Sequence, residues 1–211
     1  MRQIWDDMLP LVLMNMLSFV MQLLIIPGPG AWMALNAVCN RSANEYAFSW
    51  DHYWTAFRAN VWRAWRYALP ANIITVLIAI NFFWYPSTFG REDWVVWVQG
   101  AWLAAGLFWL VIQFYVAAFY TEQETKRWRT ALRNTAVVAG ANPLFTLTLV
   151  VITVVVLAVA LVLLPPLFAF LGLAWWAMVG NTAVVDRVKA FRAREEAQQK
   201  GSKPGASGRA R

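Results

Sequence analysis

Side chains that could do acid–base or metal chemistry are scarce in this 211-residue chain. Cys39 is its only cysteine and His52 its only histidine. One cysteine cannot form a disulfide within the chain or a thiolate metal cluster. One imidazole is too few for a zinc site or a histidine proton relay. We therefore predict that the chain holds no metal and no cofactor.

Ionisable side chains are also missing from three long stretches. No Asp, Glu, Lys, Arg or His lies between Tyr67 and Gly90, between Trp94 and Thr121, or between Asn134 and Val185. Pumps, proton-coupled transporters and intramembrane proteases need such groups at depth, where they are costly and therefore usually functional. The sequence thus predicts no catalytic residues and indicates that the chain is not an enzyme.

The acidic residues outside these stretches come in small sets: Asp6 with Asp7, Glu92 with Asp93, and Glu122 with Glu124. Two carboxylates could cleave a glycosidic bond, but neighbours on a loop seldom have the separation of about 5–10 Å that this reaction requires. We interpret these sets as solvated surface charges. The sequence also lacks the Gly-x-Ser-x-Gly, Walker and His-Glu-x-x-His motifs.

Neutral polar residues do occur inside the apolar stretches, and they line up at helical spacing. The candidates for polar contacts within the membrane are Asn15, Ser18, Gln22, Gln99, Gln113, Asn142 and Thr146. One interpretation is hydrogen bonding between helices, worth about 0.6–2 kcal/mol for each bond. The other is an uncharged path or pocket for a neutral solute such as a sugar. Both interpretations predict alignment on one face of each helix.

These side chains need elements to carry them, and the composition predicts membrane helices. The chain is 60% hydrophobic and only 14% charged, whereas about a quarter of the residues of soluble domains are charged. We predict an all-α integral membrane bundle in residues 1–186, with about five transmembrane helices. The expected spans are 8–26, 69–85, 94–119, 144–164 and 167–185.

The first span ends at a strong break. Pro27, Gly28, Pro29 and Gly30 follow the apolar run directly; the prolines remove backbone donors and the glycines allow sharp torsions. We expect the short apolar segment that follows to lie at the interface or under the bundle. Further along, Thr121 and Glu124 have the spacing of a capping box, which predicts the start of another helix.

An amphipathic helix is expected from Trp50 to about Ala68, before the second span. At 100° per residue its aromatic side chains fall on one face and its arginines on the others, which is typical of a helix lying in the membrane interface. The predicted interface residues are Trp50, Trp54, Phe57, Arg58, Arg63, Trp65 and Arg66. We hypothesise that the three arginines meet lipid phosphate.

Basic residues predict the orientation of the chain. With five spans, sixteen of the 18 Lys and Arg residues fall on one side, eight of them in the 187–211 tail. The positive-inside rule therefore predicts a multi-pass plasma-membrane protein with its N-terminus outside and its C-terminus in the cytoplasm. We expect the last helix to continue through Glu196 and the tail to be largely disordered. Its charge suits anionic lipid rather than nucleic acid.

The chain resembles the YesL-like proteins, a bacterial membrane family grouped as a domain of unknown function. The resemblance is carried by "MNMLSF" (14–19), "PGPGAWMAL" (27–35) and "FRANVWRAWRYAL" (57–69), and it covers most of 8–185. It implies an integral plasma-membrane protein of about five helices with an association to carbohydrate uptake. It supplies no catalytic residues.

Two functions remain open from the sequence. The first is a non-enzymatic accessory or scaffold protein linked to carbohydrate transport, whose partners are membrane lipids and either a transporter subunit or a second copy. The alternative is a small oligomeric carrier or channel for a neutral solute such as a sugar. Convergence of Asn15, Gln22, Gln99 and Asn142 on one wet cavity would favour the carrier, and dry pairing would favour the scaffold.

Overall fold

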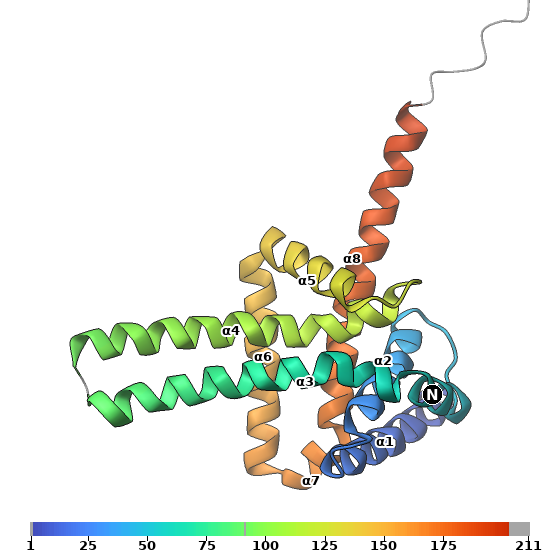
Figure 1. Cartoon of the computed structure of the whole chain (residues 1–211). Coiled ribbons are helices and arrows are strands. Elements are labelled where there is room, and N and C mark those ends of the chain that lie inside the picture. The colour runs from blue at the N-terminus through green and yellow to red at the C-terminus, as the bar shows by residue number, and fades with distance from the viewer. Residues whose placement is uncertain (1, 91, 203–211) are drawn as a thin grey trace, which may run out of the picture.

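The computed structural model describes residues 2–90 and 92–202, and in that part of the chain all regular structure is helical (Figure 1). The predicted all-α membrane bundle is confirmed. The elements are α1 (Arg2–Leu23), α2 (Gly28–Ala43), α3 (Trp50–Phe89), α4 (Asp93–Glu122), α5 (Trp128–Ala141), α6 (Pro143–Leu163), α7 (Pro165–Leu167), the π-helix η1 (Phe168–Gly172) and α8 (Leu173–Ser202).

Four helical segments among the described residues are long and apolar enough to cross a membrane: α3, α4, α6 and Phe168–Glu195. The chain is therefore a multi-pass membrane protein. The apolar part of α1, Leu9–Leu23, is shorter. α1 as a whole has 22 residues, about 33 Å at 1.5 Å per residue, against the roughly 30 Å of a hydrocarbon core. Four described segments thus meet the length of a span, and α1 corresponds to the first expected span, 8–26.

The expected interfacial helix and second span form one helix. α3 has 40 residues and continues through Pro70, so its length is about 60 Å, twice the hydrocarbon thickness. A proline can remain inside such a helix where neighbours satisfy the freed backbone groups. The two expected elements are therefore not separate, and α3 as a whole cannot lie in the interface plane and then turn to cross the membrane.

The break at residues 27–30 is present, and it also determines packing. Pro27 is the N-cap of α2, and Pro29 occupies its first turn, where a missing N–H costs little. Gly30 lies against α3, because a Cβ there would be 2.8 Å from the Cα of Val61. Glycine at this position lets the two backbones approach, so α2 is packed against α3 with most of its apolar side chains buried.

Two clusters of buried side chains form the core where α1, α2, α5 and α8 meet the adjoining ends of α3 and α4. One is centred on α4 and includes Phe114, Tyr115 and Tyr120. The other is centred on α2 and includes Met14, Leu35 and Tyr53. We call this region the proximal core.

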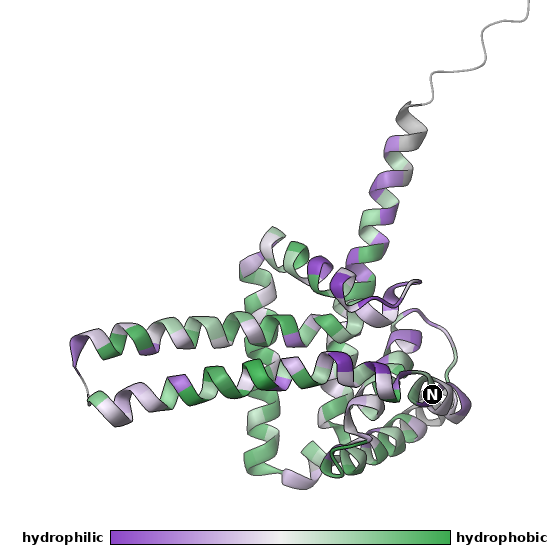
Figure 2. Ribbon diagram, viewed as in Figure 1, coloured by the Kyte–Doolittle hydropathy of each residue, from purple (hydrophilic) through white to green (hydrophobic). Residues whose placement is uncertain are grey.

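The remainder of α3 and α4 extends from the proximal core as a paired arm (Figure 1). We call residues 73–89 and 93–110 the distal hairpin. Val95 is the only residue described there that is buried, and Trp97 is 81% exposed. Figure 2 shows that the arm is mainly hydrophobic. Its apolar side chains therefore face the surroundings of the protein.

The distal hairpin runs across the direction of α6 and α8 (Figure 1). A membrane normal along α6 and α8 would place the hairpin in the plane of the bilayer, and a normal along the hairpin would place α6 and α8 there. In either orientation these apolar helices require a lipid-like environment, because water cannot cover so much exposed hydrocarbon without a large free-energy cost.

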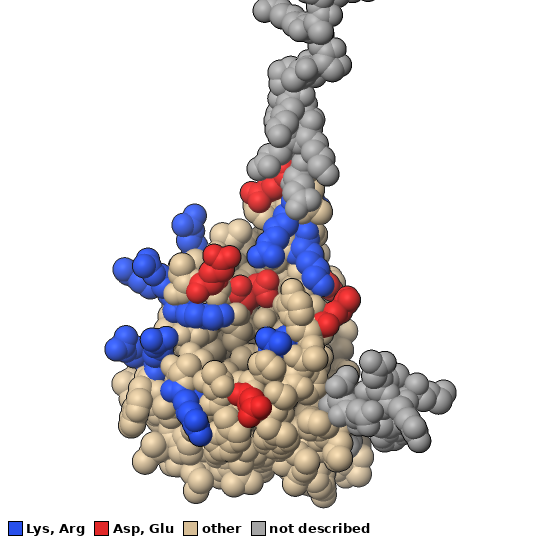
Figure 3. Space-filling model, turned by 90° about the vertical axis from the view of Figure 1, so that its right-hand side faces the viewer, with Lys and Arg blue, Asp and Glu red and all other residues tan. Residues whose placement is uncertain are grey.

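The chain breaks at Pro165 and Pro166, between the expected spans 144–164 and 167–185, and the backbone then passes through η1 into α8. α8 includes the expected continuation through Glu196 and extends six residues further, to Ser202. Residues 203–211 lie outside the described residues. On the face shown in Figure 3 the charged side chains extend from the C-terminal end of α8 to below the middle of the molecule, and the lowest part shows none.

Candidate functional site

Two of the predicted polar residues of α1, Asn15 and Ser18, make hydrogen bonds within the protein. The Asn15 side chain donates to the carbonyl of Ala169 at 2.8 Å and accepts from the N–H of Ala174 at 2.6 Å. It thereby satisfies backbone groups at both ends of η1, where the regular helix ladder changes. The Ser18 hydroxyl lies 2.7 Å from the hydroxyl of Tyr53. Asn15 and Ser18 are buried and bind partners within the protein, which is the pairing that the scaffold interpretation predicts.

Three other predicted polar residues are not brought to a common site. Gln99 is half-buried on the distal hairpin, and Asn142 is exposed at the junction of α5 and α6. Thr146 is buried, and its hydroxyl lies beside that of Tyr115 on α4. The set Asn15, Gln22, Gln99 and Asn142 therefore does not line one cavity.

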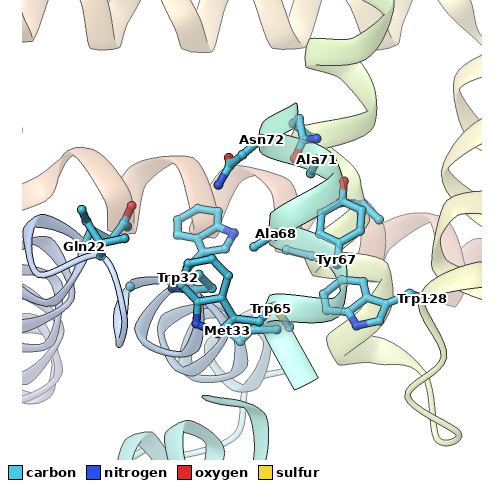
Figure 4. Close-up of a pocket in the computed structure, with 16 residues that line it drawn as sticks. Gln22, Trp32, Met33, Trp65, Tyr67, Ala68, Ala71, Asn72 and Trp128 are labelled. Carbon is cyan, nitrogen blue, oxygen red and sulfur yellow. The ribbon is translucent and has the colours of Figure 1, made fainter. Parts of the chain in front are cut away.

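Gln22 and Gln113 both line one pocket of about 350 Å³. We call it the amide pocket. Figure 4 shows Gln22 and Trp128 on opposite sides of it, with Asn72 on α3 above. Its lining residues are Gln22, Ile25, Gly28, Pro29, Trp32, Met33, Ala64, Trp65, Tyr67, Ala68, Ala71, Asn72, Gln113, Val116, Ala117 and Trp128.

An aromatic wall closes one side of the amide pocket. Trp128, at the start of α5, stacks on Tyr67 with ring centroids 4.6 Å apart and on Tyr120 at 3.9 Å. Its indole N–H donates to the carbonyl of Arg63 at 3.3 Å. Trp65 donates to the carbonyl of Ile26 at 2.9 Å, in the turn after α1. Stacking and hydrogen bonds together fix the orientation of these rings.

The polar groups of the pocket are uncharged. Three carboxamides, from Gln22, Asn72 and Gln113, and the Tyr67 hydroxyl come from three different helices. The buried Tyr67 hydroxyl lies beside the Gln113 side chain, and neither this hydroxyl nor the Gln113 amide nitrogen makes a hydrogen bond of good geometry in the described part of the chain. Buried polar atoms are rarely left unpaired. Carboxamides both donate and accept hydrogen bonds, so these groups can bind a ligand that carries hydroxyls or amides.

A second polar cluster was not predicted from the sequence. The Asn181 side chain of α8 donates to the Asn36 oxygen at 3.0 Å and accepts from Thr121 at 3.2 Å. Glu122 then accepts from Asn40 at 2.9 Å and from Asn44 at 3.2 Å. Thr121 thus lies in the last turn of α4, and α5 begins only at Trp128, so the predicted capping box is absent.

The same contacts change the interpretation of Glu122. It is half-buried and joins the C-terminal ends of α2 and α4, so it is not a free surface charge. The spacing of Asn36, Asn40 and Asn44 at i, i+4 and i+8 was the available signal, since it places three carboxamides on one face of α2. Their partners lie on other helices and have no signature in the local sequence.

The predicted interface residues divide between protein and surface. Trp54 and Phe57 pack against the α2-centred cluster, and Trp65 is also partly buried. Protein occupies the positions where the sequence predicted lipid, because Gly30 brings α2 against this face. Trp50 and the three arginines, Arg58, Arg63 and Arg66, are exposed. The role of the arginines at lipid phosphate stays a prediction.

The single histidine and the single cysteine, His52 and Cys39, both have contacts that belong to the fold. His52 closes a capping box at the start of α3, where its Nδ1 accepts from the backbone N–H of Ser49 at 3.1 Å. Cys39 is fully buried, and burial raises the pKa of its thiol to about 12. Among the described residues, no group of three His, Cys, Asp or Glu side chains could hold a metal ion.

Comparison with known proteins gives no relative. No family model, no curated protein and no solved structure matches the sequence. The amide pocket is therefore the feature of the molecule that points to a function.

Proposed function

We propose that this chain is a non-enzymatic accessory protein of the plasma membrane, linked to carbohydrate transport, that binds an uncharged sugar-like ligand in the amide pocket. The observation that carries the proposal is the lining of that pocket: three carboxamides, one phenol and three tryptophans, with no charged side chain among the 16 residues. A charged ligand there would lose its hydration without gaining an opposite charge.

Sugar chemistry suits these groups. A pyranose presents hydroxyls around its edge, which can donate to and accept from carboxamides, and C–H faces that pack on aromatic rings. The volume of about 350 Å³ is at the lower end of the range for small-molecule pockets. The link to carbohydrate uptake, with a sugar permease as the expected partner, is part of the proposal and comes only from the sequence resemblance to YesL-like proteins.

An oligomeric carrier for a neutral solute is the second candidate. It is favoured by one observation, that Gln22 of α1 and Gln113 of α4 line the same pocket. Against it, Asn15 and Ser18 are occupied by partners within the protein, so the polar residues of α1 do not continue a path beyond the pocket. The accessory role is therefore the better supported of the two.

Ligand binding tests the proposal. The protein is reconstituted in lipid nanodiscs and titrated with methyl glucoside, glucuronate and glucose 6-phosphate, with calorimetry as the readout. We expect only the neutral sugar to bind. Replacing Gln113 with Leu should weaken that binding about three- to tenfold, the value of one hydrogen bond.

The matched control is Asn81→Leu, because Asn81 donates to the Leu77 carbonyl of its own helix and does not line the pocket. It should leave affinity unchanged. Equal binding of the charged sugars, or no binding of the neutral one, would contradict the proposed site. Co-purification of a sugar permease in mild detergent tests the accessory role separately.

A further inference from the structure

A second cavity adjoins the amide pocket. It has a volume of about 460 Å³ and lies between α4, α6, η1 and α8. We call it the apolar groove. Its lining residues are Gln22, Trp32, Leu110, Val154, Leu157, Ala158, Leu161, Phe168, Gly172, Leu173 and Trp176. Apart from Gln22, this lining is hydrocarbon and aromatic.

Gln22 and Trp32 line both cavities. The amide pocket and the apolar groove therefore lie next to each other, with these two lining residues in common. The chemistry of the two cavities differs. One presents hydrogen-bonding groups and the other presents almost none. A molecule that occupies both must be amphipathic, with a hydroxyl-rich end and a hydrocarbon end.

Close packing within η1 forms one side of the groove. A Cβ on Gly172 would lie 2.8 Å from the ring of Phe168, so only glycine lets this ring lie against the π-helix. Asn15 binds the backbone at Ala169 and Ala174 and holds η1 in position from α1. The hydrogen bonds of Asn15, which does not line the groove, therefore help to maintain the shape of the groove.

Charge restricts which amphipathic molecule fits. Neither cavity has a charged lining residue, so a phosphate headgroup would be buried without a cation to compensate it. A lipid whose head is a neutral sugar avoids this cost. An acyl chain can reach the groove from the bilayer, because the groove is lined by residues of the apolar candidate spans α4, α6 and Phe168–Glu195.

We propose that the amide pocket and the apolar groove together bind one glycolipid, with its uncharged sugar headgroup in the pocket and an acyl chain along the groove. This inference rests on the proposed function, since it takes the amide pocket as a sugar site. It adds the ligand class: the sugar is attached to a lipid and is not a free solute.

Lipid retention tests the inference on the full chain. The protein is reconstituted in phosphatidylcholine nanodiscs containing monoglucosyl diacylglycerol or phosphatidylglycerol, released, and examined by native mass spectrometry for bound lipid. Methyl glucoside binding is measured on the same samples. We expect retention of the glucolipid, little retention of the anionic lipid, and binding of methyl glucoside at least tenfold weaker than binding of the glucolipid.

Two substitutions separate the head from the chain. Ala158→Phe fills the apolar groove and should reduce glucolipid retention about tenfold while leaving methyl glucoside binding unchanged. Gln113→Leu should reduce both. The matched controls are Ala105→Phe, an exposed α4 position outside both cavities, and Asn81→Leu. Leu161→Trp fills the groove from another position if Ala158→Phe lowers the yield of folded protein.

The outcomes distinguish the two proposals. If both groove-filling variants retain the glucolipid normally while Gln113→Leu loses methyl glucoside, the glycolipid inference is overturned and the sugar site stands. Equal retention of phosphatidylglycerol also overturns the inference. Failure of the wild-type protein to bind either glucolipid or methyl glucoside overturns both.

Discussion

The two ends of α3 and α4 differ in what surrounds them. In the proximal core, Tyr53, Ala64 and the run from Phe114 to Tyr120 are buried against other helices. In the distal hairpin, side chains of the same apolar kind are exposed, with Val76 at 54% and Leu103 at 53%. The helices are continuous across the boundary. Helical structure and burial inside the protein are therefore separate properties here.

The difference follows from where each region obtains its stability. A helix satisfies its own backbone hydrogen bonds, so it persists in hydrocarbon without tertiary contacts. The proximal core adds close backbone approach and paired polar groups, both of which require neighbouring helices. The distal hairpin has few such contacts and depends on lipid to cover its side chains. The same substitution should therefore have different effects in the two regions.

The largest effect is expected from a charge in the distal hairpin. Val76→Asp or Leu103→Asp should make membrane insertion about 3 kcal/mol less favourable, the cost of an aspartate near the centre of a span. Insertion can be measured by glycosylation of reporter sites on either side. Val76→Leu is the matched control and should insert normally. Unchanged insertion of both aspartate variants would indicate that the arm does not contact lipid.

Glycine gives a direct contrast between the regions. Gly30→Ala should destabilise the protein by about 1–3 kcal/mol, because its Cβ would lie 2.8 Å from the backbone of Val61. At Gly100, in the distal hairpin, an added Cβ would meet no described atom within 4 Å, so Gly100→Ala should be neutral or slightly stabilising. Unfolding in SDS–detergent mixtures measures both. If both variants changed the free energy of unfolding equally, close packing would not distinguish the proximal core from the distal hairpin.

Asparagine provides a smaller contrast. Asn15→Leu removes two hydrogen bonds to the backbone around η1 and should cost about 1–2 kcal/mol, since buried backbone groups lose their partners. Asn81→Leu removes only a bond within its own helix and should cost little. The same unfolding assay applies. A neutral Asn15→Leu variant would show that η1 does not need this contact.

The smallest expected effect concerns Cys39 and pH. Burial raises the pKa of its thiol to about 12, so the thiol should resist maleimide labelling at pH 8 until the protein unfolds. Thr125→Cys, at an exposed position between α4 and α5, is the reactive control in a Cys39→Ala background. Rapid labelling of Cys39 in the native protein would contradict its burial.

The same shift predicts how stability depends on pH. The unfolded thiol loses its proton near its ordinary pKa of 9.0, whereas the folded thiol keeps its proton up to a pKa of about 12. The folded state therefore binds more protons between these values, and the free energy of unfolding should fall as pH rises from 9 towards 12. The Cys39→Ala variant should lack this contribution.

The sequence predicted what depends on local chemistry. The breaks at Pro27–Gly30 and Pro165–Pro166, the apolar stretch that forms α6, and the exposure of Arg58 follow from side chains and their neighbours. It also placed Gln22 and Gln113 among the polar residues of interest, although it did not predict that they share a pocket.

What the sequence could not predict depends on contacts between distant segments. Asn15 binds backbone groups more than 150 residues away, and no local pattern indicates that pairing. The sequence pattern of the aromatic face of α3 is the same whether lipid or α2 covers that face. The close approach of α2 to α3 at Gly30 is visible only in the folded structure. The same is true of Thr121, whose partner Asn181 lies on α8.

Spin-label accessibility along the distal hairpin tests the central claim most directly, which is that lipid covers this arm. In a Cys39→Ala background, nitroxides at Val76, Ile80 and Leu103 are compared with one at the buried Met33, in lipid vesicles. We predict frequent collisions with oxygen and few with a water-soluble nickel complex at the three hairpin positions, and few with either at Met33. Frequent collisions with nickel along the hairpin would place it in water and contradict the account.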